Sequence, residues 1–188
     1  MTGIKTIYNH NFFVITGGPG VGKTTLLGEL EKRNFKCISE VAREIIKKQA
    51  GSNGEALPWK NKELYKELLM DRSIASYELI THTNNGITFF DRGIPDTLSY
   101  ARLINSTISL EMDFYASHYR YNKKVFILPP WLEIYTTDNE RKQTWKEAVQ
   151  TYEILAATYK QYNYELIEVP KTPVNERVEF ILRTLDLQ

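Results

Sequence analysis

The sequence predicts an α/β fold of three layers, in which helices cover both faces of a five-stranded parallel sheet. Two observations support this fold class: short apolar runs recur along the chain, and amphipathic helical segments separate them. Strands that are joined through helices pair in parallel with right-handed crossovers. At 188 residues the chain fits one domain, residues 1–188.

The expected strands are short runs rich in β-branched and aromatic residues. They are residues 12–16, 35–40, 87–91, 123–128 and 164–169. Apolar residues at helical spacing predict helices that begin near Thr25, Val41, Lys60, Pro95, Ser109, Trp145 and Pro173. Because ligands of open parallel sheets bind outside the carboxyl ends of the strands, we expect the residues that follow each strand to form the site.

A glycine-rich loop joins the first strand to the first helix. It fits the pattern G-x-x-x-x-G-K-[ST] at every fixed position, in the strand-to-helix context that the motif requires. The glycines let successive backbone N–H groups turn toward phosphate oxygens, and the helix dipole adds to this attraction. We therefore expect a nucleoside triphosphate, ATP, to be bound by Gly18, Pro19, Gly20, Val21, Gly22, Lys23, Thr24 and Thr25.

Two residues of this loop have more specific expected roles. Lys23 would reach the β- and γ-phosphates, and the Thr24 hydroxyl would be a ligand of the Mg²⁺ ion that bridges them. Asp91 ends the third strand and is the second expected Mg²⁺ ligand, although an acidic residue that merely ends a strand is the alternative. Arg92 follows and would either bind a phosphate, steady a carboxylate, or lie on the surface as an ordinary charge.

Glu40 ends the second strand and has two readings. A carboxylate there would orient an acceptor hydroxyl and take its proton during phosphoryl transfer. It would otherwise be an acidic cap on the helix that begins at Val41, favourable to the helix dipole and chemically idle. Arg43 lies about one helical turn further on and would pair with Glu40 or bind substrate.

A polar stretch without periodicity precedes the helix near Trp145. We interpret residues 131–144 as a lid-like segment that closes over the phosphates and excludes water. Arg141 would then bring a guanidinium to the charge that builds in the transition state. A solvated helix start with mixed charges is the alternative.

Composition excludes several classes of protein. The 24 basic and 23 acidic residues leave a net charge of +1, which argues against a dedicated nucleic-acid-binding domain. Cys37 is the single cysteine, so no intramolecular disulfide forms. No apolar run approaches the roughly 20 residues of a membrane span, and the three histidines lack zinc-site spacing. We expect a soluble, cytoplasmic protein with no metal besides Mg²⁺.

Four motifs together resemble a known family: the glycine-rich loop, Glu40-Val41-Ala42-Arg43-Glu44, residues 90–96 and residues 140–145. The chain resembles small stand-alone P-loop proteins described as predicted AAA-type ATPases, which are related to the kinase domain of nicotinamide riboside kinase and regulator proteins. More distantly it is similar to deoxynucleoside and nucleoside monophosphate kinases. The resemblance implies the strand order 2-3-1-4-5, with Glu40 as catalytic base, Asp91-Arg92 as the acidic-Arg pair and residues 140–143 in the lid.

The leading interpretation is an Mg²⁺-dependent, kinase-like phosphotransferase that uses ATP and an unidentified small-molecule acceptor. Its catalytic residues would be Lys23, Glu40, Asp91, Arg92 and Arg141. The alternative is a nucleotide-dependent switch or ATPase that acts through a protein partner by ordering residues 136–143. A motor ATPase is disfavoured, because motor ATPases normally have a strand that ends in Asp-Glu, and here the corresponding strand ends in Asp91-Arg92.

Overall fold

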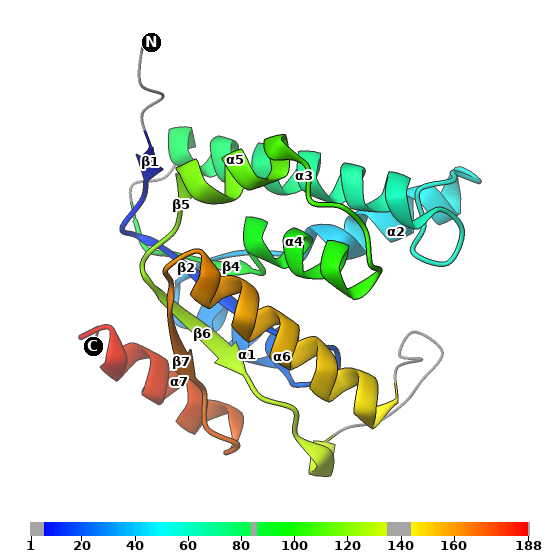
Figure 1. The fold of residues 1–188 in the computed structure, drawn as a ribbon. Coiled ribbons are helices and arrows are strands. Elements are labelled where there is room, and N and C mark those ends of the chain that lie inside the picture. The colour runs from blue at the N-terminus through cyan, green and yellow to red at the C-terminus, as the bar shows by residue number, and fades with distance from the viewer. Residues whose placement is uncertain (1–5, 84–85, 135–143, 188) are drawn as a thin grey trace.

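The computed structural model describes residues 6–83, 86–134 and 144–187. Its central sheet has five strands: β2 (Phe12–Gly17), β3 (Lys36–Ile38), β4 (Thr88–Asp91), β6 (Lys124–Leu128) and β7 (Glu165–Glu168). Their spatial order is β3-β4-β2-β6-β7, and every neighbouring pair is parallel (Figure 1). Counted along the chain, this order is 2-3-1-4-5. The predicted fold class and strand order are therefore confirmed.

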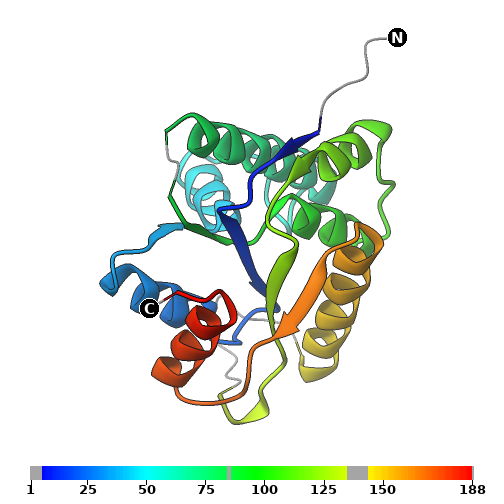
Figure 2. The same ribbon diagram turned by 90° about the vertical axis from the view of Figure 1, so that its left-hand side faces the viewer.

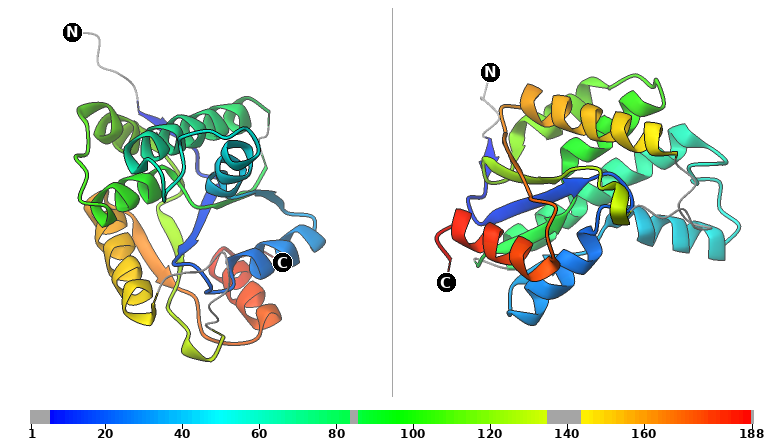
Figure 3. Two further views of the ribbon diagram at one scale, coloured as in Figure 1. Left: turned by 90° about the vertical axis from the view of Figure 1, so that its right-hand side faces the viewer. Right: turned by 90° about the horizontal axis from the view of Figure 1, so that it is seen from below.

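Seven α-helices are present in the described part of the chain: α1 (Lys23–Lys32), α2 (Val41–Gly51), α3 (Lys62–Thr83), α4 (Ile94–Leu103), α5 (Leu110–His118), α6 (Trp145–Gln161) and α7 (Val174–Thr184). A short 3₁₀ helix, η1 (Leu132–Ile134), follows β6. Helices α1 and α7 lie together on one face of the sheet, and α4 and α6 lie on the other (Figure 2). Helix α3 packs against α4 and, through Tyr77, against Phe12 of β2, so it lies on the same face of the sheet as α4 and α6 (Figure 3).

Strand β2 shows why the sheet lies at the centre of the molecule. All six of its residues are buried, because helices cover both faces. Its side chains alternate between two cores: Phe12 and Val14 pack with α3, α4 and α6, whereas Phe13 and Ile15 pack with α1 and α7. A continuous apolar run in the sequence is thus the expected mark of this strand.

Several helices begin where local chemistry favours a start. At α6 the Thr144 hydroxyl accepts from the Glu147 N–H, while the Glu147 carboxylate accepts from the Thr144 N–H, which is a capping box. At α4 Pro95 occupies the first turn, where its missing N–H costs nothing. The ends of the predicted helices and strands agree with the structure to within a few residues in most cases.

One feature was absent from the sequence-based prediction. Strands β1 (Ile7–Tyr8) and β5 (Tyr119–Arg120) form a separate two-stranded parallel sheet. The helix that the sequence predicts to begin near Ser109 ends at His118, directly before β5. The Tyr77 hydroxyl donates to the carbonyl oxygens of Arg120 and Ile7, 2.8 and 3.3 Å away, and so ties the small sheet to α3. Two-residue strands are too short to produce an alternating pattern.

The strand ends place the candidate site. Because all five strands of the central sheet are parallel, their carboxyl ends lie along one edge, where the glycine-rich loop follows β2, Glu40 follows β3 and Asp91 ends β4. None of the described helices combines the length and the apolar character that crossing a bilayer requires.

Candidate active site

Lys23 begins α1 and lies under the glycine-rich loop. Its ammonium donates to the carbonyl oxygens of Gly17 and Gly18, each 2.9 Å away, and the residue is only 7% exposed. Burial lowers its pKa from the usual 10.5 to about 8, and the positive charge of Arg92 acts in the same direction. Gly22 precedes Lys23 with a φ of 86°, a conformation that side chains rarely adopt, so the loop needs glycine at this position.

Glu40 is held by two guanidinium groups. Its Oε1 accepts from Arg92 Nε at 2.7 Å, and its Oε2 accepts from Arg43 Nε at 3.2 Å. Burial by itself would raise the pKa of Glu40, but Arg92, Lys23 and the hydrogen bond from Arg92 together lower it to about 2. The carboxylate is therefore ionised at any pH near neutral.

Arg92 joins two carboxylates from separate elements. Besides Glu40 it contacts Asp96, with 3.1 Å between Nη1 and Oδ1. Burial alone would lower the pKa of Arg92, but Glu40 and Asp96 raise it well above its usual value. Its φ is 74°, and the other positive-φ residues in the described parts of the chain are Gly, Asn or Asp. A bulky residue in this conformation is strained, which occurs where the surrounding contacts hold it in place, as at functional sites.

Asp96 ends the motif of residues 90–96, and the sequence alone indicates no catalytic role for it. Its Oδ1 accepts from Thr16 Oγ1 at 2.6 Å and from Arg92, and its Oδ2 accepts from the Gly93 N–H at 2.9 Å and from the Tyr159 hydroxyl. Asp96 therefore holds the Arg92 guanidinium in place from the first turn of α4. One sequence signal points to it: Asp96 stands in the first turn of the helix that Pro95 opens, where a carboxylate caps the backbone.

Asp91 and Thr24 supply oxygen atoms beside the loop. Asp91 is buried, and its Oδ1 has no hydrogen-bond partner among the residues that the structure describes. Burial raises the pKa of Asp91, and Lys23 offsets part of this effect. The Thr24 hydroxyl is 3.2 Å from Arg43 Nη2. An unpartnered buried carboxylate oxygen and a nearby hydroxyl fit Mg²⁺, which takes oxygen ligands and usually only one or two from the protein.

The other predicted residues fall into two groups. The loop residues Gly18 to Gly22 and Thr25 lie where the motif places them, between β2 and the first turn of α1. Arg141 and the segment 135–143, most of the predicted lid, lie outside the described residues. The structure also brings Arg177 of α7 against the loop, with its Nη1 3.4 Å from the Val21 carbonyl oxygen. Sequence reasoning missed this residue, since nothing in the spacing of α7 distinguishes it.

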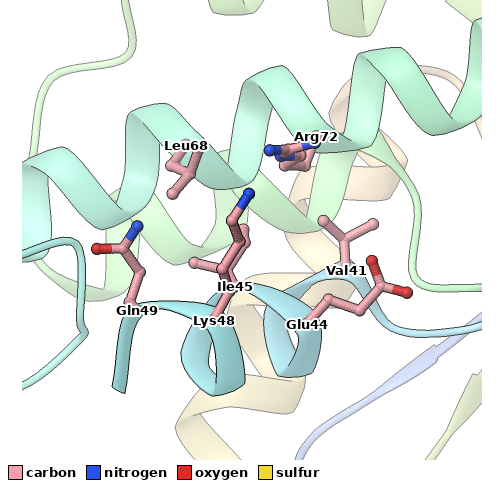
Figure 4. Close-up of a pocket in the computed structure, with 7 residues that line it drawn as sticks. All are labelled: Val41, Glu44, Ile45, Lys48, Gln49, Leu68 and Arg72. Atoms are coloured by element: carbon pink, nitrogen blue, oxygen red, sulfur yellow. The ribbon is translucent and has the colours of Figure 1, made fainter. Parts of the chain in front are cut away.

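A separate hollow of about 290 Å³ lies between α2 and α3. Figure 4 shows Leu68 pointing from α3 toward α2 and Lys48 pointing from α2 toward α3. Its lining mixes apolar and charged side chains: Val41, Glu44, Ile45, Lys48, Gln49, Leu68 and Arg72. One of these residues, Val41, directly follows Glu40 in the sequence.

Comparison with known proteins identifies the family. A family model described as an AAA domain matches residues 12–177, which is most of the chain. The chain belongs to this AAA-domain family. The match begins at β2 and ends in α7, so it includes the loop, Glu40, Asp91 and Asp96. No protein among those of curated function matches the sequence.

Solved structures similar to this AAA-domain protein include several kinases. A NadR protein in complex with NR has a TM-score of 0.67 and 16% identity, covering 96% of this chain and 52% of that one. Thymidylate kinase from Candida albicans has a TM-score of 0.62 and 16% identity, with 95% and 93% covered. Deoxyadenosine kinase from M. mycoides with bound dATP has a TM-score of 0.58 and 15% identity, with 94% and 100% covered.

These similarities show the fold that the chain shares with P-loop kinases. The chain spans about half the length of the NadR protein. The family relationship expected from the sequence is confirmed.

Proposed function

We propose that this protein is an ATP- and Mg²⁺-dependent phosphotransferase that moves the γ-phosphoryl group to a hydroxyl of a small-molecule acceptor. The observation that carries the proposal is the chain of charges beside the loop: Glu40 is paired with Arg92, and Arg92 is paired with Asp96. A simple nucleotide-binding loop does not need a carboxylate that two guanidinium groups hold in one orientation. Phosphoryl transfer does need fixed charges, since its catalysis is mostly positioning and electrostatic stabilisation.

The glycine-rich loop would bind the triphosphate. Its backbone N–H groups and the N-terminus of α1 attract phosphate oxygens, and the Lys23 ammonium would exchange the Gly17 and Gly18 carbonyls for the β- and γ-phosphates. Thr24 and Asp91 would hold Mg²⁺, which supplies charge neutralisation across the phosphates. Arg92 and Arg141 would stabilise the charge of the transferred group.

Glu40 would orient the acceptor. Its pKa of about 2 makes it a weak base but a permanent hydrogen-bond acceptor near neutral pH. The acceptor oxygen would form a bond to the γ-phosphorus while the bond from phosphorus to ADP breaks, and the hydroxyl proton would leave through Glu40. A loose transition state places little demand on early proton removal, so orientation is the larger part of this role.

Two substitutions and a control test the proposal. A thermal-shift screen of small hydroxyl compounds with Mg²⁺ and a non-hydrolysable ATP analogue would first identify an acceptor, because ligands that prefer the folded state raise the melting temperature. Lys23→Ala should abolish ATP binding, whereas Glu40→Gln should bind ATP normally and lose transfer. Glu44 is an exposed carboxylate on α2, the helix that follows Glu40, and the control variant Glu44→Gln should behave like the unmodified protein. Full transfer by Glu40→Gln would refute the role of Glu40.

The alternative function is a nucleotide-dependent switch that acts through a protein partner. It depends on residues 136–143, which lie outside the described residues, and nothing in the described site favours it. A nucleotide-bound structure in which Glu40, Arg43 and Asp91 enclose a second pocket facing the γ-phosphate would support the phosphotransferase instead.

A further inference from the structure

Arg177 is a buried cation that lies against the glycine-rich loop. It is 6% exposed and stands in the first turn of α7. Its Nη1 is 3.4 Å from the Val21 carbonyl oxygen, and a Cβ added to Gly22 would lie 2.9 Å from the same nitrogen. The guanidinium carbon is 5.5 Å from the centre of the Trp131 ring. The group is therefore held between the loop and an aromatic face.

The positive charge of Arg177 has no acidic partner within the described parts of the chain. Its Nε, which is buried, makes no hydrogen bond there either. Burial is the one cause that shifts the pKa of Arg177, and it lowers it. Arg92 provides the contrast, because it is also largely buried but pairs with Glu40 and Asp96. Buried charges in proteins are normally paired, since removal from water is costly.

The position of Arg177 indicates which anion would pair with it. Val21 and Gly22, the residues it touches, belong to the loop whose N–H groups and helix dipole attract phosphate. Lys23 lies among Arg92, Asp91 and Glu40, at the carboxyl ends of β3 and β4. Arg177 comes instead from α7, which packs against α1. Lys23 and Arg177 therefore reach the loop from different elements, α1 and α7.

We propose that Arg177 is a phosphate-binding residue of this site, and that the triphosphate bound by the loop is the counter-ion of its guanidinium. Trp131 holds the guanidinium over the loop through a cation–π contact. The inference rests on the proposed nucleotide binding and adds a cation to it from the last helix. If Arg177 instead only ties α7 to the loop, its replacement should lower the stability of the free protein and leave its affinity for phosphate ligands unchanged.

Calorimetric titration of Arg177→Met with Mg²⁺-ATP and with inorganic tripolyphosphate separates these roles. If the guanidinium pairs with phosphate, the Kd for both ligands rises by about 10- to 100-fold, the usual cost of a lost charged hydrogen bond. The melting temperature of the free protein stays the same or rises, because an unpaired buried charge has been removed. Arg183→Met, an exposed arginine on the same helix, is the matched control and should change neither quantity.

Four results would overturn the proposal. A lower melting temperature with unchanged Kd values would make Arg177 a structural clamp. Weaker ATP binding with unchanged tripolyphosphate binding would mean that it contacts the nucleoside. If the methionine variant does not fold, Arg177→Gln takes its place, because glutamine removes the charge but keeps a donor for the Val21 carbonyl. Normal affinity of the glutamine variant for both ligands would also overturn the proposal. Absence of ATP and tripolyphosphate binding to the unmodified protein would overturn this inference together with the proposed function.

Discussion

ATP binding should weaken as the pH rises above about 8, because Lys23 then loses its proton in the free protein. Burial lowers the pKa of this lysine to about 8 from its usual 10.5. Bound phosphate oxygens favour the charged ammonium, so they raise the pKa again in the complex. Binding above pH 8 must then be accompanied by uptake of a proton.

The size of the effect follows from the same pKa. At pH 9 roughly nine-tenths of Lys23 would be neutral in the free protein, so the apparent Kd for ATP rises about tenfold between pH 7 and 9. Stability should change in the opposite direction. Between about pH 8 and 10.5 the unfolded chain keeps the proton that the folded protein has lost, so the free energy of unfolding of the free protein increases with pH.

Isothermal titration calorimetry in buffers of different ionisation enthalpy measures both the Kd and the number of protons taken up. The terminal phosphate of ATP does not interfere, since its last pKa is about 6. Lys23→Arg is the control, because a guanidinium does not titrate in this range and its Kd should stay constant from pH 7 to 9. A constant Kd for the unmodified protein over the same range would refute the reasoning.

Three further outcomes test the site and the core. Acid should destabilise the protein between about pH 4.5 and 2, because there the Glu40 carboxyl takes up a proton in the unfolded chain but stays ionised in the folded protein. Denaturant unfolding should show that Glu40→Gln removes about 3 kcal/mol of this dependence. Arg92→Lys should lower the transfer rate about 100-fold but change the Kd for ATP little, since lysine lacks the planar fork that spans Glu40 and Asp96. Leu98→Ala, at a fully buried position of α4, should cost about 3 kcal/mol in urea unfolding.

Much of the fold was predictable because its signals are local. The apolar run of β2, the glycines and lysine of the loop and the helical spacing of α6 each lie within one short stretch of sequence. The β1–β5 sheet was missed because two-residue strands carry no periodic pattern, and their pairing depends on Tyr77, more than 40 residues from either. The predicted roles of Arg141 and of the segment 135–143 remain predictions.

The sequence by itself determined the phosphate-binding loop, the order of helices and strands, and the carboxylates at the strand ends, because backbone preference and amphipathic spacing act over a few residues. Only the tertiary structure decided the partners of those side chains. Glu40 meets Arg92 from 52 positions away, and Val21 meets Arg177 from 156 positions away. Such pairs depend on which strands are neighbours and on how each helix lies against the sheet, and these are properties of the packed molecule.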